Sequence, residues 1–213
     1  MTKLLSLFIL VALSAGISAQ ELKSIVLNSP DKTRGLPVMQ ALEKRASASE
    51  FSSEKLSLQD LSDLLWAADG INRPERKLRT APSATNAQDI DIYVFMEEGI
   101  YLYNAGPHIL DPVASGDHRK LVAERQPEMA KASVFLLLTS DIARFRNFPD
   151  SVKLSWAAMD AGIVSQNIAI FCASAGLSTR PRAVMDHAKL REILKLKDSQ
   201  YLMLNNPVSY PVK

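Results

Sequence analysis

The chain has 213 residues, of which 47% are hydrophobic and 23% are charged, and its formal net charge is +2 at pH 7. These values are typical of a globular protein with one domain, and the nearly balanced charge argues against nucleic acid as a partner. Cys172 is the single cysteine, which precludes an internal disulfide, and the sequence has no CxxC or HExxH pattern to support metal chemistry.

Residues 1–19 are predicted to be a secretory signal peptide. Lys3 gives a short basic start, an apolar run follows from Leu4 to Leu13, and mostly small residues lead to Ala19. Cleavage after Ala19 would give an exported, periplasmic protein with no membrane segment. The alternative is an N-terminal membrane anchor, which the shortness of the apolar run disfavours.

An arm and two helices are predicted next. Residues 20–37 contain prolines and little periodicity, which indicates an extended arm. Apolar residues at helical spacing predict a first helix at 38–48. Ser57 and Asp60 form an S-x-x-D cap signature for a second helix, which Gly70 ends.

A loop, a meander and a buried strand follow. Residues 71–89 are irregular, and a loop of this length inside a domain is usually functional or disordered. Alternating apolar residues predict an antiparallel meander over 91–113. Residues 118–131 predict a helix interrupted at Pro127, and the continuous apolar run 132–139 predicts a central buried strand.

The longest predicted helix spans 154–177. Its apolar residues fall on nearly every face, as in a buried helix, and Gly176 provides a stop. The elements after it are a short exposed strand or loop, a helix and a last strand, at 178–184, 186–194 and 201–206. Because strands and helices are partly segregated, we expect an α+β fold, with one mixed, mainly antiparallel sheet flanked by helices, in a single domain over 38–213.

The first polar stretch that could carry chemistry follows the first helix. Arg45 stands at the helix end, with Ala46, Ser47 and Ser49 just beyond it. A guanidinium with neighbouring hydroxyl and backbone N–H groups can bind a phosphate. The alternative is a cation that stabilises the helix C-terminus while the serines form a turn.

The second stretch, Arg79 to Gln88, lies in the long loop. Pro82 stiffens the backbone, while Ser83 and Asn86 offer donors and acceptors in a small area. Such a loop suits hydrogen bonding along the edge of a flat heterocycle, although an ordinary solvated polar loop has the same composition.

The third stretch, Gly176 to Arg182, begins where the long helix ends. Backbone amides that leave a buried helix there could face a ligand. The alternative is a glycine C-cap followed by a polar linker.

Taken together, these stretches resemble the nitroreductase superfamily of flavin-dependent oxidoreductases, which includes the SagB-type peptide dehydrogenases. The family begins with R-x-S-x-R-x-F, which Arg45, Ser47 and Phe51 match, whereas Ser49 replaces the second Arg. The blocks L-L-W-A-A-x-G-I-N and R-T-x-P-S-A-x-N-x-Q, with the I-Y-V strand after them, are matched over 64–72 and 79–94.

Further stretches resemble the SagB-like branch of that superfamily. They are GIYLYNAGPHILDPVASGDHR, the long helix through SQN and CASAGL, and VSYP. Ser209 replaces the usual Gly of the closing V-G-Y-P. The resemblance covers about 38–213, and the order and spacing of the motifs carry it.

The resemblance implies an FMN enzyme that works as an intertwined homodimer with two active sites at the interface. The FMN-contacting positions that it implies are Arg45, Ala46, Ser47, Ser49, Pro82, Ser83, Asn86, Leu177, Ser178, Thr179 and Lys213. The first group would hold the phosphate and ribityl chain, with Lys213 as a further cation. The residues of the second stretch would contact the flavin partly from the partner subunit. Residues 177–179 would place backbone groups near the redox-active edge of the flavin.

Flavin itself would carry out the hydride or electron transfer, so no catalytic residue is assigned. The leading hypothesis is ping-pong reduction of nitroaromatic, quinone-like or other conjugated substrates, with NAD(P)H as a possible donor. Because NAD(P)H is scarce outside the cytoplasm, an exported SagB-type dehydrogenase that oxidises a peptide or small molecule is an alternative. A non-catalytic flavin-binding protein is another, motivated by Ser49 and Ser209.

The long helix gains a second role from the resemblance. One of its faces would lie at the dimer interface against the equivalent helix of the partner. Ala158, Ala161 and Gly162 would then be small to allow close approach of the two helices.

Overall fold

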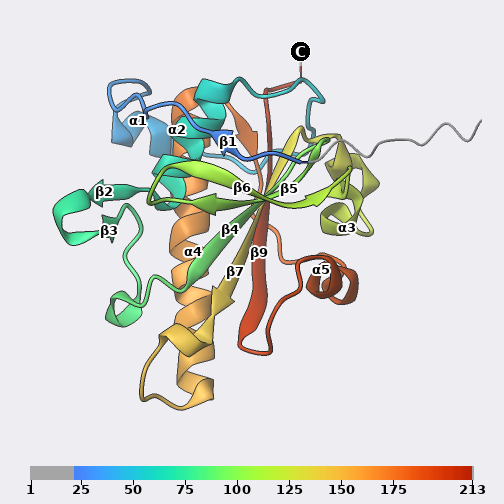
Figure 1. Cartoon of the computed structure of the whole chain (residues 1–213). Helices are drawn as coiled ribbons and strands as arrows, with labels where there is room; N and C mark the ends of the chain where they lie inside the picture. Colours follow the sequence, from blue (N-terminus) through green and yellow to red (C-terminus); the bar gives the residue numbers. More distant parts are fainter. Residues whose placement is uncertain (1–21, 213) are drawn as a thin grey trace, which may run out of the picture.

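A seven-stranded sheet forms the centre of the molecule (Figure 1). The computed structural model describes residues 22–212, so the predicted signal peptide and Lys213 lie outside the described residues. The strands of the sheet are β1 (Ile25–Val26), β4 (Ile90–Phe95), β5 (Gly99–Asn104), β6 (Ile109–Ser115), β7 (Val134–Asp141), β8 (Ser178–Thr179) and β9 (Gln200–Ser209). Their order is β1-β6-β5-β4-β7-β9-β8. Neighbouring strands run antiparallel throughout, which confirms the predicted α+β fold with a mainly antiparallel sheet.

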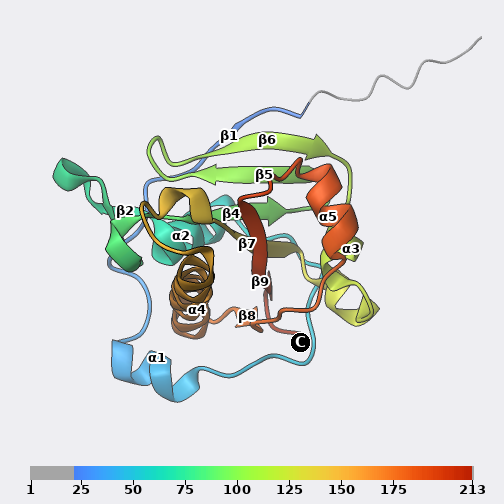
Figure 2. The ribbon, with the colours of Figure 1, turned by 90° about the horizontal axis from the view of Figure 1, so that it is seen from below.

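Helices cover both faces of this sheet. They are α1 (Val38–Lys44), α2 (Leu58–Asp69), α3 (Arg119–Ala123), α4 (Asp150–Ala175) and α5 (His187–Ile193). Figure 2 shows α2 and α4 on one side of β7 and β9, with α3 and α5 on the other. Side chains of β7 alternate between the two sides: Leu136 and Leu138 pack with α2 and α4, whereas Phe135 and Leu137 pack with α3 and α5. The first helix, α1, packs on the outside of α4.

Local signals in the sequence set several element boundaries as predicted. Ser57 Oγ accepts a hydrogen bond from the Asp60 N–H group (3.0 Å) at the start of α2. Gly176 ends α4 with φ +72°, a left-handed conformation that glycine adopts without steric cost. The predicted meander forms as β4, β5 and β6, and the predicted buried strand forms as β7 between β4 and β9.

Other boundaries differ from the prediction. The first helix ends at Lys44 rather than at residue 48, because the backbone leaves the helical conformation at Arg45 (φ −59°, ψ 118°). Residues 71–89 are not wholly irregular, since β2 (Ile71–Arg73) and β3 (Leu78–Arg79) pair in a small hairpin. The last strand was predicted to stop before Pro207, but β9 continues to Ser209 because it pairs with β7 and β8 at this end.

The predicted arm is part of the folded unit. Its strand β1 adds to the edge of the sheet beside β6. Arg34 then binds two carboxylates of α2, Asp60 at 2.7 Å and Asp63 at 2.8 Å. The arm is therefore tied to both the sheet and a helix that covers it.

Only part of the surface of α4 is buried. Ala161 is fully buried within the chain itself, so the expectation that it lines a helix–helix interface with a partner is wrong. Ala158 and Gly162 are exposed, and Met159 is 64% exposed. The composition of α4 is apolar all round, but the side that carries Ala158, Met159 and Gly162 is not covered within this chain. No helix among residues 22–212 is long and apolar enough to cross a membrane.

Candidate functional site

Two of the three polar stretches lie side by side. The Ala48 N–H group donates a hydrogen bond to the Thr179 carbonyl oxygen (2.9 Å), so residues 45–49 run along β8 directly after α4. On its other side β8 pairs with the end of β9, with Ser178 opposite Ser209. Residues that are far apart in the sequence therefore form one surface at this corner of the sheet.

This corner exposes the groups that were expected to bind a phosphate. Arg45, Ala46, Ser47 and Ser49 are all exposed, whereas Phe51 is buried in the core on the α3 and α5 side of the sheet. The buried Phe51 ring fixes one end of the segment, and the Ala48 hydrogen bond fixes its middle. The guanidinium and hydroxyl groups are thus presented to solvent on a backbone that is held in place.

The third stretch has fewer free backbone groups than its sequence implied. The Leu177 N–H group donates to the Cys172 carbonyl oxygen (2.8 Å), as part of the C-terminal cap of α4. The Thr179 carbonyl oxygen accepts from Ala48. The prediction of an exposed segment over 178–184 is wrong at Thr179 and Arg182, which are 3% and 7% exposed.

Arg182 is buried for a structural reason. Its guanidinium donates to the carbonyl oxygens of Val122 (3.2 Å) and Ala123 (3.0 Å), at the end of α3, and to Asn205 Oδ1 (2.8 Å) on β9. These bonds tie the segment after α4 to the opposite face of the sheet. The sequence placed Arg182 next to a proline in a polar run and gave no signal of this burial.

The second stretch lies elsewhere on α4. The Ala84 N–H group donates to Asp160 Oδ2 (2.9 Å), and the Gln88 N–H group donates to Ser83 Oγ (2.8 Å). Pro82 and Asn86 are exposed. Along the axis of α4, Asp160 and Gly176 are about 24 Å apart at 1.5 Å per residue. Within one chain, the second stretch is therefore separated from the other two.

Three buried carboxyl groups lie next to this second stretch. Asp69, Asp89 and Asp160 are 4%, 0% and 4% exposed. Burial raises the pKa of Asp69 to about 7, although Arg79 forms an ion pair with it at 2.9 Å. Burial also raises the pKa of Asp89 to about 7, and the neighbouring Asp160 adds to this shift. Sequence patterns do not indicate this cluster, because its members come from separate elements.

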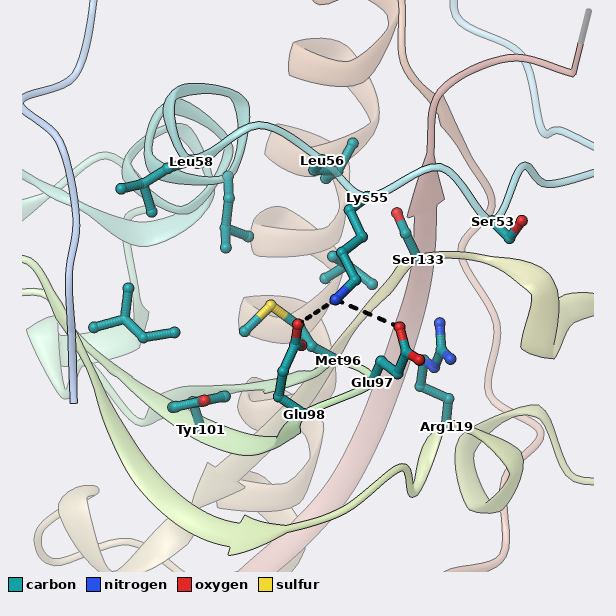
Figure 3. A pocket seen from close by; sticks show the side chains of 13 residues that line it. Ser53, Lys55, Leu56, Leu58, Met96, Glu97, Glu98, Tyr101, Arg119 and Ser133 are labelled. Atoms are coloured by element: carbon teal, nitrogen blue, oxygen red, sulfur yellow. Dashed lines mark hydrogen bonds and ion pairs between the residues drawn. The ribbon is translucent and has the colours of Figure 1, made fainter. Parts of the chain in front are cut away.

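An apolar pocket of about 240 Å³ lies between the segment before α2 and the turn from β4 to β5 (Figure 3). Leu56, Met96 and Tyr101 contribute to its walls, and Lys55 reaches across it toward Glu97 and Glu98. The Lys55 Nζ atom is 2.5 Å from Glu98 Oε1 and 3.5 Å from Glu97 Oε2. Among residues 22–212, none of the predicted FMN-contacting residues lines this pocket, so the expected cofactor surface is the open corner described above.

Two of the three histidine side chains, those of His108 and His118, have structural partners. His108 Nδ1 and the Tyr103 hydroxyl are hydrogen bonded at 2.9 Å, and burial lowers the pKa of His108. His118 Nε2 is 2.9 Å from the Ser115 carbonyl oxygen. Neither residue lies at the corner formed by residues 45–49 and β8.

Known proteins resemble this chain in sequence and in fold. The sequence profile of the Nitroreductase family matches residues 42–208. "Putative nitroreductase MJ1384" of Methanocaldococcus jannaschii is 32% identical over 173 residues, which cover 76% of this chain and 86% of that protein. The crystal structure of a "putative nitroreductase" from Ralstonia eutropha JMP134 matches this structure with a TM-score of 0.84. The two sequences are 31% identical, and the match covers 92% of each chain.

A more distant likeness concerns the fold alone. A chain of the E. coli microcin synthetase McbBCD complex has a TM-score of 0.71 at 17% identity, and the match covers 97% of this chain and 85% of that one. None of these matches singles out the SagB-type branch. The family profile and the two relatives at 31–32% identity support membership of the nitroreductase family as a whole.

Proposed function

The chain belongs to the nitroreductase family, and from this premise we propose that it binds FMN and transfers a hydride or electrons to a nitroaromatic, quinone-like or other conjugated substrate. The observation that carries the proposal is the hydrogen bond between Ala48 and Thr179, because it brings the exposed Arg45 and Ser47 alongside the segment after α4. Bound FMN would supply the redox chemistry, while the protein supplies binding, orientation and electrostatics.

The donors at this corner fit a flavin phosphate. The Arg45 guanidinium can donate two parallel hydrogen bonds to phosphate oxygens, and the nearby residues Ser47 and Ser49 are exposed as well. Ser49 brings no charge where the family pattern has Arg, so we expect weaker phosphate binding than an arginine would give. Lys213 remains a candidate for a second cation.

We further propose that the site is completed by a second copy of the chain. Pro82, Ser83 and Asn86 lie beside Asp160, about 24 Å along α4 from the end of the helix near Arg45. They are therefore too far away to reach a flavin held by Arg45 of the same chain. The outer surfaces of α1 and α4 expose Val38 (61%), Met39 (73%) and Met159 (64%), as a homodimer interface on this side would require. The second stretch would then contact the flavin of the partner.

Two versions of this function, a reductase and a dehydrogenase, differ in the source of the electrons that reduce the flavin. NAD(P)H is the candidate donor for a reductase, and no G-x-G-x-x-G pattern is present, so it would stack transiently on the flavin. The predicted signal peptide favours a second candidate, an exported dehydrogenase that oxidises a peptide or small molecule and passes the electrons on. Anaerobic reduction of the bound flavin by NADH or NADPH supports the first, and reduction by substrate alone supports the second.

The experiment that tests FMN binding uses purified mature protein. We expect a yellow protein with a flavin absorption band at about 450 nm, which a reductant bleaches. Arg45→Ala should raise the Kd for FMN by about 10- to 100-fold, as expected for loss of a charge-assisted pair. The control is Arg76→Ala, since Arg76 is equally exposed but lies between β2 and β3. A protein that cannot be loaded with FMN would overturn the proposal, and flavin that no donor reduces would indicate a non-catalytic binding protein.

A further inference from the structure

The loop of residues 82–88 is held in a strained conformation. Thr85, Asn86 and Gln88 have φ values of +53°, +54° and +48°, in the left-handed region that few residues other than glycine adopt. Thr85 is β-branched, so its strain is the largest of the three. Such a conformation persists only where surrounding contacts fix it.

The contact that fixes the loop to α4 is made by a buried carboxyl group. Asp160 Oδ2 accepts the hydrogen bond of the Ala84 N–H group at 2.9 Å, directly before the strained residues. The other end of the loop is held by Arg144, whose Nη1 donates to the Gln88 carbonyl oxygen at 2.7 Å. Asp160 is therefore the only side chain of α4 that hydrogen bonds to residues 82–88 in the described part of the chain.

A second buried carboxyl group faces Asp160. Asp89 is fully buried directly after the loop, and its Oδ2 atom accepts a hydrogen bond from Ser140 Oγ. Its Oδ1 atom is buried and has no donor within hydrogen-bonding distance. After burial, Asp160 is the group that raises the pKa of Asp89 most strongly, through a side-chain hydrogen bond and through its charge. No lysine, arginine or histidine within residues 22–212 forms an ion pair with either carboxyl group.

Two carboxylates in this position would repel each other and leave a buried charge uncompensated. A proton on Asp89 Oδ1 removes both problems, because it turns the orphaned acceptor into a donor to Asp160. Asp160 Oδ2 still accepts the hydrogen bond of the Ala84 N–H group. We propose that Asp89 and Asp160 share one proton, and that this carboxyl pair positions the loop of residues 82–88.

The consequence for FMN rests on the proposed function, in which this loop contacts the flavin. As the pH rises and the shared proton leaves, the pair becomes two facing carboxylates, and their repulsion weakens the hold of Asp160 on the loop. Other charges around the pair belong to its neighbouring elements, from α2 to the end of β7; they are Asp69, Arg79, Asp91, Asp141 and Arg144. Arg79 and Arg144 are engaged with Asp69 and Asp91, so they do not neutralise the pair.

The test of the shared proton is a titration of the flavin-free full chain. Carbon-13 NMR of the aspartate carboxyl carbons, from about pH 5 to about pH 9, should show a carboxyl group that titrates near pH 7. Asp69 should titrate in the same range, so the signal that is lost in Asp89→Asn should be retained in Asp69→Asn, and the second signal should behave in the opposite way. In Asp160→Asn the Asp89 midpoint should fall, because the amide donates to a carboxylate. Absence of any Asp89 signal above about pH 6 would overturn the shared proton.

The test of positioning is the pH dependence of FMN binding. In the native protein the Kd for FMN should rise at least about fivefold between about pH 6 and about pH 9, and in Asp89→Asn it should change less than about twofold. The asparagine can accept from Ser140 and donate to Asp160 at every pH. A pH-independent Kd in the native protein, with Asp89 titrating near pH 7, would overturn the positioning role. If no FMN binds to either protein, the proposed function fails, while the NMR titration still decides on the proton.

Discussion

Substitutions of Gly162 can distinguish effects on the stability of the single chain from effects on dimer assembly. A Cβ atom added at Gly162 would meet no other atom within 4 Å, so a larger side chain on this exposed turn of α4 has room within one chain. Glycine in a helix interior costs about 0.8–1.0 kcal/mol relative to alanine, and leucine is nearly as favourable as alanine. We therefore expect Gly162→Leu to raise the unfolding free energy of the isolated chain by about 0.8 kcal/mol.

The same substitution should break the proposed dimer. If α4 packs closely against its partner at this turn, the leucine side chain will separate the two helices and release FMN with them. Sedimentation velocity gives the mass of the species, and absorbance gives the flavin content of each. Gly162→Ala is the matched control, since it gains the same helix propensity without bulk and should remain a dimer that holds FMN. A monomeric Gly162→Leu protein with full FMN content would refute the link between the interface and the site.

Further predictions concern buried polar groups and pH. Arg182→Met should lower the unfolding free energy by about 2–4 kcal/mol, because it removes the donor to the Val122 carbonyl oxygen and to Asn205 Oδ1. Arg180→Met, at an exposed neighbouring position, should change it by less than about 0.5 kcal/mol in the same urea titration. The raised pKa of Asp89 means that its proton stabilises the folded state fully below about pH 4 and that this contribution is lost as the pH rises to about 7. Unfolding free energies measured across this range should fall less steeply in Asp89→Asn than in the native protein, and equal slopes would count against the assignment. Ser49→Arg should lower the Kd for FMN several-fold by adding a second cation, and an unchanged Kd would place Ser49 away from the phosphate.

Local sequence signals predicted the elements whose ends depend on adjacent residues. The Ser57 cap of α2 and the Gly176 stop of α4 are set by hydrogen bonds between residues a few positions apart. The buried strand β7 followed from a continuous apolar run, because a strand covered on both faces needs no polar side. These features require no knowledge of the rest of the fold.

The features that the sequence did not reveal depend on contacts between distant segments. Nothing near Ala48 indicates that its N–H group meets Thr179, and this contact is what assembles the candidate phosphate site. Asp160 is the charged residue within the apolar helix 154–177, and Asp89 comes directly before β4. Neither position in the sequence indicates that the two carboxyl groups meet. Arg182 lies in a polar run that predicts exposure, but the ends of α3 and β9 provide acceptors that bury it. Pattern and propensity describe neighbours along the chain and are silent on such pairs.

The proposed flavin site draws residues from two chains, and mixing two defective chains tests this directly. Arg45→Ala and Asn86→Ala homodimers should each bind FMN poorly, because every site lacks one contact. After the two proteins are mixed and allowed to exchange subunits, half of the dimers carry one intact site, so about a quarter of all sites should regain tight FMN binding. If the Arg45 and Asn86 contacts come from the same chain, the mixture will bind no more FMN than its components, and the shared site is refuted.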